Sequence, residues 1–300
     1  MRGGYSIMFH YVHNHQSYKK VQGSVSAEEL TSIIHSDEHN ILSPIEWLEK
    51  FSLGKLRSND VFLSFDDGLK EQFDIAVPIL NKYNIRALFN IYTEPIVENK
   101  LSVIEKYRYV RNYEFKNLND FYLRFFEKVR LDYNVDVEKL DLGNYLSDYK
   151  FYSKNDILFR FLRDVLLKDE FHNVMQKISE ELRINDNHLL EKIYMNKYDV
   201  IELHNMGHLI GLHSHSHSTL MNTFDYERSL YEYSKNKDFL EFLTNASIIV
   251  AAYPLGKYNS ESIKALKKIN VKYAFESKRT ENTDAFKLSR IDVADVLVKR

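Results

Sequence analysis

The chain has 300 residues, of which 44% are hydrophobic, enough for the core of one large domain or two small ones. Its 41 Lys and Arg and 43 Asp and Glu are interspersed and give a formal charge of −2 at pH 7, so we expect no binding to nucleic acid or to an anionic membrane. The lack of cysteine excludes disulfides and thiolate metal sites and fits a reducing compartment. Residues 1–6 do not open a long apolar segment, and no run of about 18 apolar residues follows. We therefore expect a soluble, cytoplasmic protein without a membrane span.

Short apolar runs alternate with helical patterns along the chain. One helical pattern spans Phe73–Tyr83, where Ile75, Ile79 and Leu80 keep helical spacing. This alternation predicts a parallel sheet with helices outside it. The predicted strands are Ile7–Val12, Val61–Phe65, Ala87–Ile91, Val200–Leu203, Ile210–Leu212, Ile248–Ala252 and Val271–Phe275.

Residues 96–197 interrupt the alternation with a sequence of helical period. Phe121, Phe125 and Val129 are spaced four residues apart, and a second apolar stripe follows over residues 157–166. We interpret these stripes as packing faces of an all-helical insertion.

Two adjacent carboxylates, Asp66 and Asp67, follow the strand pattern that ends at Phe65. Side chains that are neighbours on an extended strand point in opposite directions, but both can reach one site where the strand breaks into a turn. Gly68 supplies the conformational freedom for such a break. The same three residues are also an ordinary turn signal.

A run of alternating histidines, His213, His215 and His217, follows the apolar pattern at Ile210–Leu212. On a helix or a tight turn His213 and His217 share a side, whereas on an extended strand all three share a face, so the spacing leaves both arrangements open. Imidazole and carboxylate are zinc ligands, and a catalytic zinc commonly has three protein ligands. A metal-bound Asp is a poor base, so its neighbour would accept the proton.

These residues resemble the NodB-like polysaccharide deacetylases of carbohydrate esterase family four. The family's first motif, Thr/Ser-Phe-Asp-Asp-Gly, is matched at Ser64–Gly68, and its second, His-Ser/Thr-x-x-His, at His213–His217. A third element, an aromatic residue followed by proline, is similar to Tyr253-Pro254. The resemblance implies a single irregular (β/α) barrel domain over residues 1–300, with residues 96–197 inserted as helices and the site at the carboxyl ends of the strands.

The chain departs from the family pattern at two places. Ala251-Ala252 stands where an Arg is usual, and no C-terminal Leu-x-His supplies the general-acid histidine. In a circularly permuted branch of the family, which acts on poly-N-acetylglucosamine, that histidine lies in an N-terminal strand. The resemblance to this branch implies His10 as the acid, and it suggests that Arg290 contacts the catalytic Asp.

The resemblance implies a metal-dependent hydrolase that removes an N-acetyl group from an amino sugar in cell-surface glycan synthesis. Asp67, His213 and His217 would bind a divalent metal, most simply Zn²⁺ with Co²⁺ or Ni²⁺ as alternatives, and His215 would not be a ligand. Asp66 would be the base, and the Tyr253 N–H would help to stabilise the oxyanion.

Rival functions remain open at this stage. The same site could remove a formyl or O-acetyl group from a related sugar, or the barrel could bind carbohydrate without catalysis. The substrate sugar could be free, nucleotide-linked, lipid-linked or oligomeric. We also expect the helical insertion to wall the cleft and restrict it to short substrates, because loops at that end of a barrel carry function.

Overall fold

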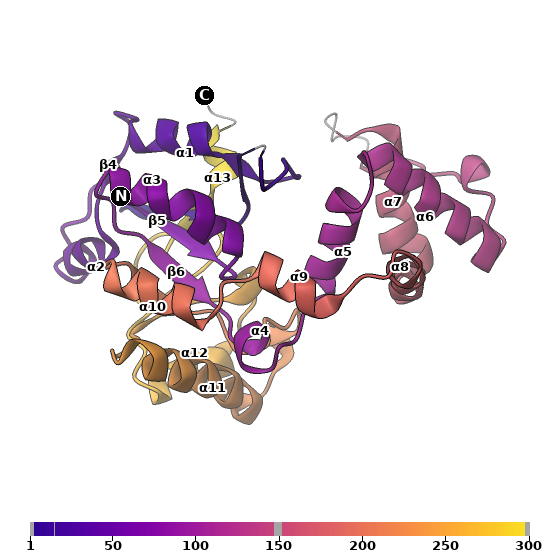
Figure 1. Cartoon of the computed structure of the whole chain (residues 1–300). Helices are drawn as coiled ribbons and strands as arrows, with labels where there is room; N and C mark the ends of the chain where they lie inside the picture. The colour runs from indigo at the N-terminus through magenta and orange to yellow at the C-terminus, as the bar shows by residue number, and fades with distance from the viewer. Residues whose placement is uncertain (1–2, 15, 147–151, 298–300) are drawn as a thin grey trace. The chain divides into compact units, whose positions relative to one another are not determined.

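The computed structural model describes residues 3–14, 16–146 and 152–297 (Figure 1). The chain forms two compact units. The larger combines Met1–Lys100 with Leu190–Arg300, and the smaller is Leu101–Leu189.

The larger unit is built on a parallel sheet that nearly closes into a barrel. The strand order is β10-β1-β5-β6-β7-β8-β9, and the short β4 pairs with the start of β5. A parallel bridge between Phe275 and Leu288 brings the β9 edge to the chain that enters β10, which closes most of the gap. The predicted (β/α) barrel is therefore confirmed. The strands are β1 (Tyr5–Phe9), β4 (Asn40–Ile41), β5 (Asp60–Asp66), β6 (Leu88–Ile91), β7 (Leu209–Leu212), β8 (Val250–Ala252), β9 (Tyr273–Phe275) and β10 (Arg290–Asp292).

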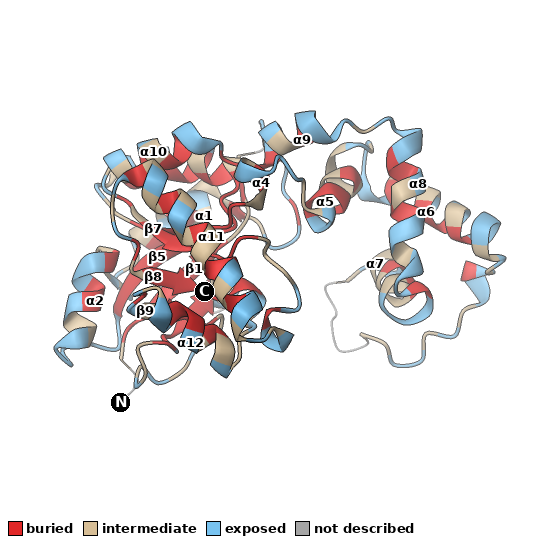
Figure 2. Cartoon of the chain, turned by 90° about the horizontal axis from the view of Figure 1, so that it is seen from below, coloured by how far each residue is buried: buried red, intermediate tan, exposed pale blue. Residues whose placement is uncertain are grey.

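Helices surround this sheet, and Figure 2 shows buried strands beneath helices whose outer faces are exposed. A small parallel pair, β2 (Val12–His13) with β3 (Val25–Ser26), lies outside the main sheet. No described helix has both the length and the apolarity that a bilayer crossing requires. The helices are α1 (Ala27–Ile34), α2 (Pro44–Ser52), α3 (Val77–Lys82), α4 (Glu94–Val97), α10 (Lys197–Asn205), α11 (Tyr226–Thr244), α12 (Ser260–Lys268) and α13 (Val293–Leu297). Helix α9 (Asp186–Ile193) begins in the smaller unit and ends in the larger one.

One predicted strand is wrong. Val200–Leu203 lies inside α10, whose first turn is fixed by a capping box between Asn196 and Asp199. Val200 and Leu203 are buried while Ile201 and Glu202 between them are not, as expected for helical spacing. A short segment with three apolar residues does not distinguish a strand from the buried face of a helix, and the cap decides the outcome here.

The smaller unit is helical and has a core of its own. Phe121, Phe125 and Val129 are buried in it, as their spacing predicts, whereas Val165 and Leu166 of the second stripe are exposed. This unit is shorter than the predicted insertion of residues 96–197. Its helices are α5 (Val103–Tyr113), α6 (Leu118–Tyr133), α7 (Lys154–Phe161) and α8 (Glu170–Glu181).

The residues after the smaller unit return to the barrel at its first motif. The Met195 N–H donates to the Gly68 carbonyl at 2.9 Å, and Tyr194 forms an antiparallel bridge with Leu69. These contacts explain why residues 190–197 belong to the barrel unit.

A buried histidine makes the stability of the barrel depend on pH. His208 is 2% exposed, its Nδ1 accepts from the Ala87 N–H at 3.2 Å, and its ring packs against that of Phe89 in a T-shaped arrangement. Burial, helped by the charge of Arg86, lowers the pKa of His208 to about 4. Because this is below the unfolded value of about 6.5, the unfolded state binds the proton more readily. The stability that comes from keeping His208 neutral is therefore fully present above about pH 6.5 and is lost as the pH falls toward 4.

We expect His208→Asn, whose Oδ1 can still accept from Ala87, to lose less stability on acidification than the native chain. Between pH 7.5 and 5.5 the native protein should lose about 1 kcal/mol more than the variant. Urea unfolding at both pH values measures this difference. Equal losses in the two proteins would contradict the assignment.

Candidate metal and catalytic site

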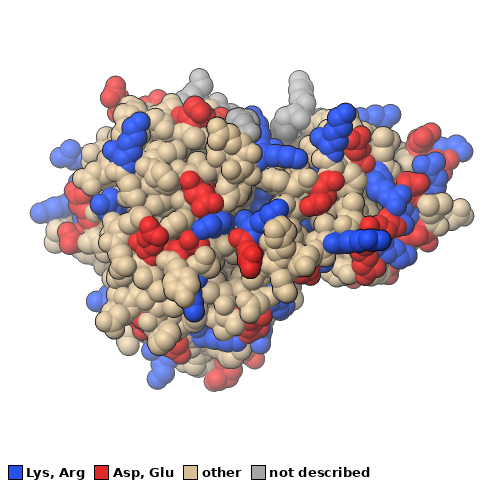
Figure 3. Space-filling model, viewed as in Figure 1, with Lys and Arg blue, Asp and Glu red and all other residues tan. Residues whose placement is uncertain are grey.

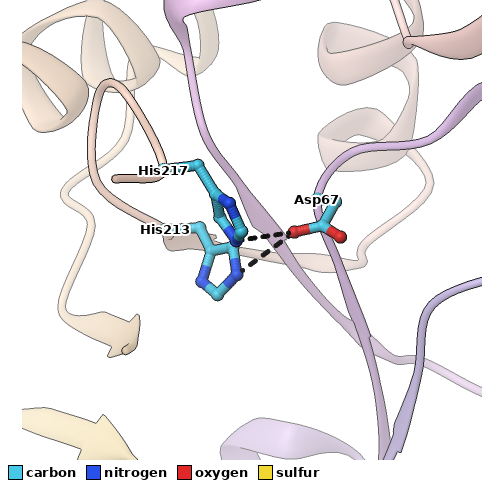
Figure 4. Close-up of side chains that lie close together, drawn as sticks. All are labelled: Asp67, His213 and His217. Atoms are coloured by element: carbon cyan, nitrogen blue, oxygen red, sulfur yellow. Dashed lines mark ion pairs between the residues drawn. The ribbon is translucent and has the colours of Figure 1, made fainter. Parts of the chain in front are cut away.

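The two carboxylates and the histidine loop meet where β5 and β7 end. Asp66 is the last residue of β5, Asp67 follows it, and His213 follows the last residue of β7. Figure 4 shows the side chains of Asp67, His213 and His217 pointing toward one another. The predicted pair of motifs is thus brought into contact although 145 residues separate Gly68 from His213.

A sharp turn after β5 lets both carboxylates reach the site. Asp67 and Gly68 are both left-handed, with φ of 77° and 65°, which is costly for Asp67 because it has a Cβ. The buried Gln72 stabilises the turn, since its Nε2 donates to the Asp66 carbonyl at 2.6 Å and to the His10 carbonyl at 2.8 Å. As a result, His213 Nε2 lies 3.3 Å from Asp67 Oδ1 and 3.9 Å from Asp66 Oδ2.

The histidine loop is a tight turn, which decides between the two arrangements that the spacing left open. Ser214 and His217 are left-handed, with φ of 61° and 50°, and the His217 N–H donates to Ser214 Oγ at 3.0 Å. The rings of His213 and His217 come within 4.9 Å, centroid to centroid. The ring of His215 lies elsewhere, with Nδ1 2.9 Å from Thr93 Oγ1 and Nε2 2.9 Å from Glu98 Oε1.

The three predicted ligands fit a small divalent metal. Asp67 Oδ1 lies 3.3 Å from His213 Nε2 and 3.1 Å from His217 Nε2. Zinc bonds of about 2.0–2.1 Å in a tetrahedron separate the ligand atoms by roughly 3.3 Å. Asp67 Oδ1 is buried, and no described residue forms a geometrically acceptable hydrogen bond with it. A buried carboxylate oxygen without a hydrogen bond is costly, and a bound cation would remove that cost.

The tautomer of His213 suits metal binding. Its Nδ1 lies 2.9 Å from the Ala252 carbonyl, which can only accept, so Nδ1 carries the hydrogen and Nε2 presents a lone pair toward Asp67. Burial opposes the ionisation of Asp67, but the charges of His217 and His10 hold its pKa well below the usual range. The carboxylate is therefore in the anionic form that a metal requires.

Two side chains donate hydrogen bonds to one oxygen of the Asp66 carboxylate. Arg290 Nη1 and Asn90 Nδ2 each donate to Asp66 Oδ1 at 2.7 Å. Burial raises the pKa of Asp66, but the charges of Arg290, His213 and His10 outweigh it and lower the pKa to about 2. Arg290 is itself fully buried, and its Nε donates to the Glu276 carbonyl at 2.8 Å. Arg290 thus contacts Asp66 from β10, at the other end of the chain.

His10 and Tyr253 have different surroundings. His10 follows β1, is partly exposed, and is close enough that its charge lowers the pKa of both Asp66 and Asp67. Tyr253 is fully buried, its N–H donates to the Phe275 carbonyl at 3.2 Å, and its hydroxyl donates to the Phe286 carbonyl at 3.0 Å. The predicted role of the Tyr253 N–H at an oxyanion would require its hydrogen bond to Phe275 to break.

The sequence did not reveal the part played by Asn90. This residue lies on β6 opposite Gly211 of β7, and a Cβ at Gly211 would come within 2.3 Å of Asn90 Oδ1. The glycine therefore provides the space in which the Asn90 amide reaches Asp66. A glycine within a short apolar strand was the available signal, because it marks close approach of another group.

A second group of possible ligands lies near the first. Glu94, Glu98 and His215 could also bring three ligand atoms together. Lys100 pairs with Glu94 at 2.7 Å, and Lys235 pairs with Glu98. Because these lysines already balance both carboxylates, the group is better described as an ion-pair network.

Comparison with known proteins identifies a similar family and similar folds. A family model described as polysaccharide deacetylase matches residues 159–274, a segment that includes His213 and His217. No protein of curated function matches the sequence significantly.

The fold is similar to those of several solved proteins, two of which are described as deacetylases. The deacetylase PplD of Streptococcus pyogenes, solved with acetate, has a TM-score of 0.56 at 15% identity and aligns over 99% of this chain and 97% of its own. The de-N-acetylase of Aggregatibacter actinomycetemcomitans has a TM-score of 0.55 at 14% identity over 96% and 94%. IcaB of Ammonifex degensii has a TM-score of 0.58 at 13% identity over 97% and 92%.

The resemblance to polysaccharide deacetylases is therefore confirmed, by the family model over residues 159–274 and by the fold. The likeness to the circularly permuted branch stays a prediction.

The contact between Gly211 and Asn90 gives a testable coupling. Gly211→Ala should destabilise the native chain by about 1–3 kcal/mol, because the new methyl group overpacks the barrel interior against the Asn90 amide. In an Asn90→Ala background the same substitution should cost clearly less. Urea unfolding of the two single variants and the double variant measures the coupling. Additive effects within about 0.5 kcal/mol would contradict the contact.

Proposed function

We propose that this protein is a metal-dependent hydrolase that removes the N-acetyl group of an amino sugar during cell-surface glycan synthesis. The observation that carries the proposal is a three-residue ligand set beside a separate, ionised carboxylate at the carboxyl ends of β5 and β7. The match to polysaccharide deacetylases supports the acyl group and the sugar as the reacting partners.

Asp67, His213 and His217 would hold the metal. Two imidazoles and one carboxylate suit zinc, and Co²⁺ or Ni²⁺ accept the same ligands. When bound, such an ion polarises the acyl carbonyl and lowers the pKa of water toward about 7. The hydrogen bond from His213 Nδ1 to Ala252 fixes the ring with Nε2 toward the ligand set.

Asp66 is the proposed general base. Its pKa of about 2 keeps the carboxylate ionised, which is the form that accepts a proton from the attacking water. Arg290 and Asn90 occupy Oδ1 and leave Oδ2 on the side of His213. These two donors therefore orient the base, and Arg290 also balances its charge.

His10 is the proposed general acid. An amide cannot be cleaved to a free amine anion, so the departing nitrogen needs a proton from a group opposite the base. His10 is the partly exposed histidine whose charge reaches both carboxylates. For Tyr253 we propose a role for the backbone N–H alone. It could stabilise the oxyanion only after its hydrogen bond to the Phe275 carbonyl breaks.

Acetate release from N-acetylated sugars tests the proposed function. The panel comprises N-acetylglucosamine oligomers and nucleotide-linked and lipid-linked N-acetyl sugars, each with and without chelator, together with formylated and O-acetylated analogues. We expect acetate from an N-acetyl sugar, loss of activity with chelator, and recovery with zinc. Turnover confined to formyl or O-acetyl substrates would replace the proposed reaction, and binding without turnover of any of them would indicate an inactive barrel.

The ligand set predicts how metal content responds to substitution. His213→Ala and His217→Ala should each lose bound zinc, since each removes one of three protein ligands. His215→Ala serves as the matched control, because its ring faces Thr93 and Glu98, and it should retain the metal. Elemental analysis of the purified proteins measures this. Unchanged zinc in both ligand variants would refute the assignment.

Substitution of the proposed base or acid should lower kcat without loss of the metal. Asp66→Asn should keep the metal yet lower kcat by about 10²- to 10⁴-fold, the usual contribution of a general acid or base, and His10→Ala should do the same. Steady-state kinetics on metal-loaded protein separates these effects from ligand loss. Near-native kcat in either variant would remove that residue from the proposed mechanism.

A further inference from the structure

Helix α11 presents two fully buried polar side chains to the histidine loop. Glu232 and Asn236 are one turn apart, so they lie on the same face of the helix, and both have 0% exposure. Neither belongs to the ligand set or to the proposed proton-transfer groups. Their partners show what they do there.

Asn236 joins the start of the loop to the end of the neighbouring strand. Its Oδ1 accepts from the backbone N–H of His213 at 3.0 Å. Its Nδ2 donates to the carbonyl of Ile91, the last residue of β6, at 2.9 Å and to Thr93 Oγ1 at 3.2 Å. One amide therefore fixes the position of His213 relative to β6.

Glu232 holds the far part of the same loop. Its Oε2 accepts from the Ser216 N–H at 2.8 Å, and its Oε1 accepts from Ser216 Oγ at 2.9 Å. Arg228, one turn earlier on α11, lies 3.1 Å from Oε1 and balances the charge. The residue after Ser216 is the second ligand, His217.

The loop needs such support because its own conformation is unfavourable. Ser214 and His217 are both left-handed residues with a Cβ, and such conformations are strained and persist only where the surroundings impose them. The bond between His217 N–H and Ser214 Oγ closes the turn but does not attach it to the rest of the barrel. Glu232 and Asn236 make that attachment at both ends.

We propose that Glu232 and Asn236 are positioning residues that hold His213 and His217 in the geometry needed to bind metal. This inference rests on the proposed metal site. Packing alone would not explain these residues, because a buried carboxylate or amide is costly unless its hydrogen bonds are made, and an apolar side chain would fill the same space. Both side chains direct their hydrogen bonds to the loop or to the strand end beside it.

Metal affinity tests the proposal. Competition titration with Zn²⁺ and Co²⁺ should show affinity weakened by about 10- to 100-fold in Asn236→Ala and in Glu232→Gln, the usual effect of removing a partner that orients a ligand. Ser229→Ala is the matched control. Ser229 is buried on the same helix, and its hydroxyl has no hydrogen bond among the described residues. The control should bind metal within about twofold of the native protein.

Hydrogen exchange of the metal-free proteins supplies the second measurement. Amides of residues 213–217 should exchange faster in both variants than in the native chain and in Ser229→Ala, while α11 remains protected. Glu232→Gln preserves side-chain shape, so the test does not depend on Asn236→Ala folding. Native-like affinity and native-like exchange of the loop in Glu232→Gln would overturn the proposal. If the native protein binds no metal, the proposed function fails, and the exchange measurement still decides whether α11 holds the loop.

Discussion

The ion pair between Asp66 and Arg290 is the contact on which the site depends. Two adjacent carboxylates are buried at the end of β5, and burial of an uncompensated charge costs several kcal/mol. Arg290, from the last strand, balances one of them at 2.7 Å, while the histidines face the other. Because β10 pairs with β1, the end of the chain must return to the barrel before Asp66 has its partner. Folding of the barrel and ionisation of Asp66 are therefore linked.

The rest of the site is a set of strained turns held by side chains outside it. Asp67, Ser214 and His217 adopt left-handed conformations, and Gln72, Glu232 and Asn236 bond to the backbone around them. Strain of this kind is retained where the surrounding structure imposes it, which is typical of functional sites. Figure 3 shows acidic and basic side chains intermingled on the visible face, in contrast to the concentrated, compensated charge of the buried site.

Much of this arrangement could be predicted from the sequence. Short apolar runs predicted six of the seven proposed strands correctly, and the two motifs predicted which carboxylate and which histidines would meet. The strand predicted at Val200–Leu203 was wrong because a four-residue segment with three apolar residues fits either structure, and the Asn196 cap selects the helix. Asn236 could not be found, since its role depends on a contact between a helix and a loop distant in sequence, and for Asn90 the sequence offered only the indirect signal of Gly211. The prediction that the helical unit restricts the substrate stays a prediction.

Anomalous diffraction at the zinc absorption edge, from crystals of the zinc-loaded protein, tests the central claim most directly. The account predicts one strong peak within about 2.0–2.2 Å of Asp67, His213 Nε2 and His217 Nε2. A second possible site in the same protein consists of Glu94, Glu98 and His215. Zinc should not bind there, because lysines already pair with both glutamates. A peak at that second group, or none at the first under saturating zinc, would contradict the account.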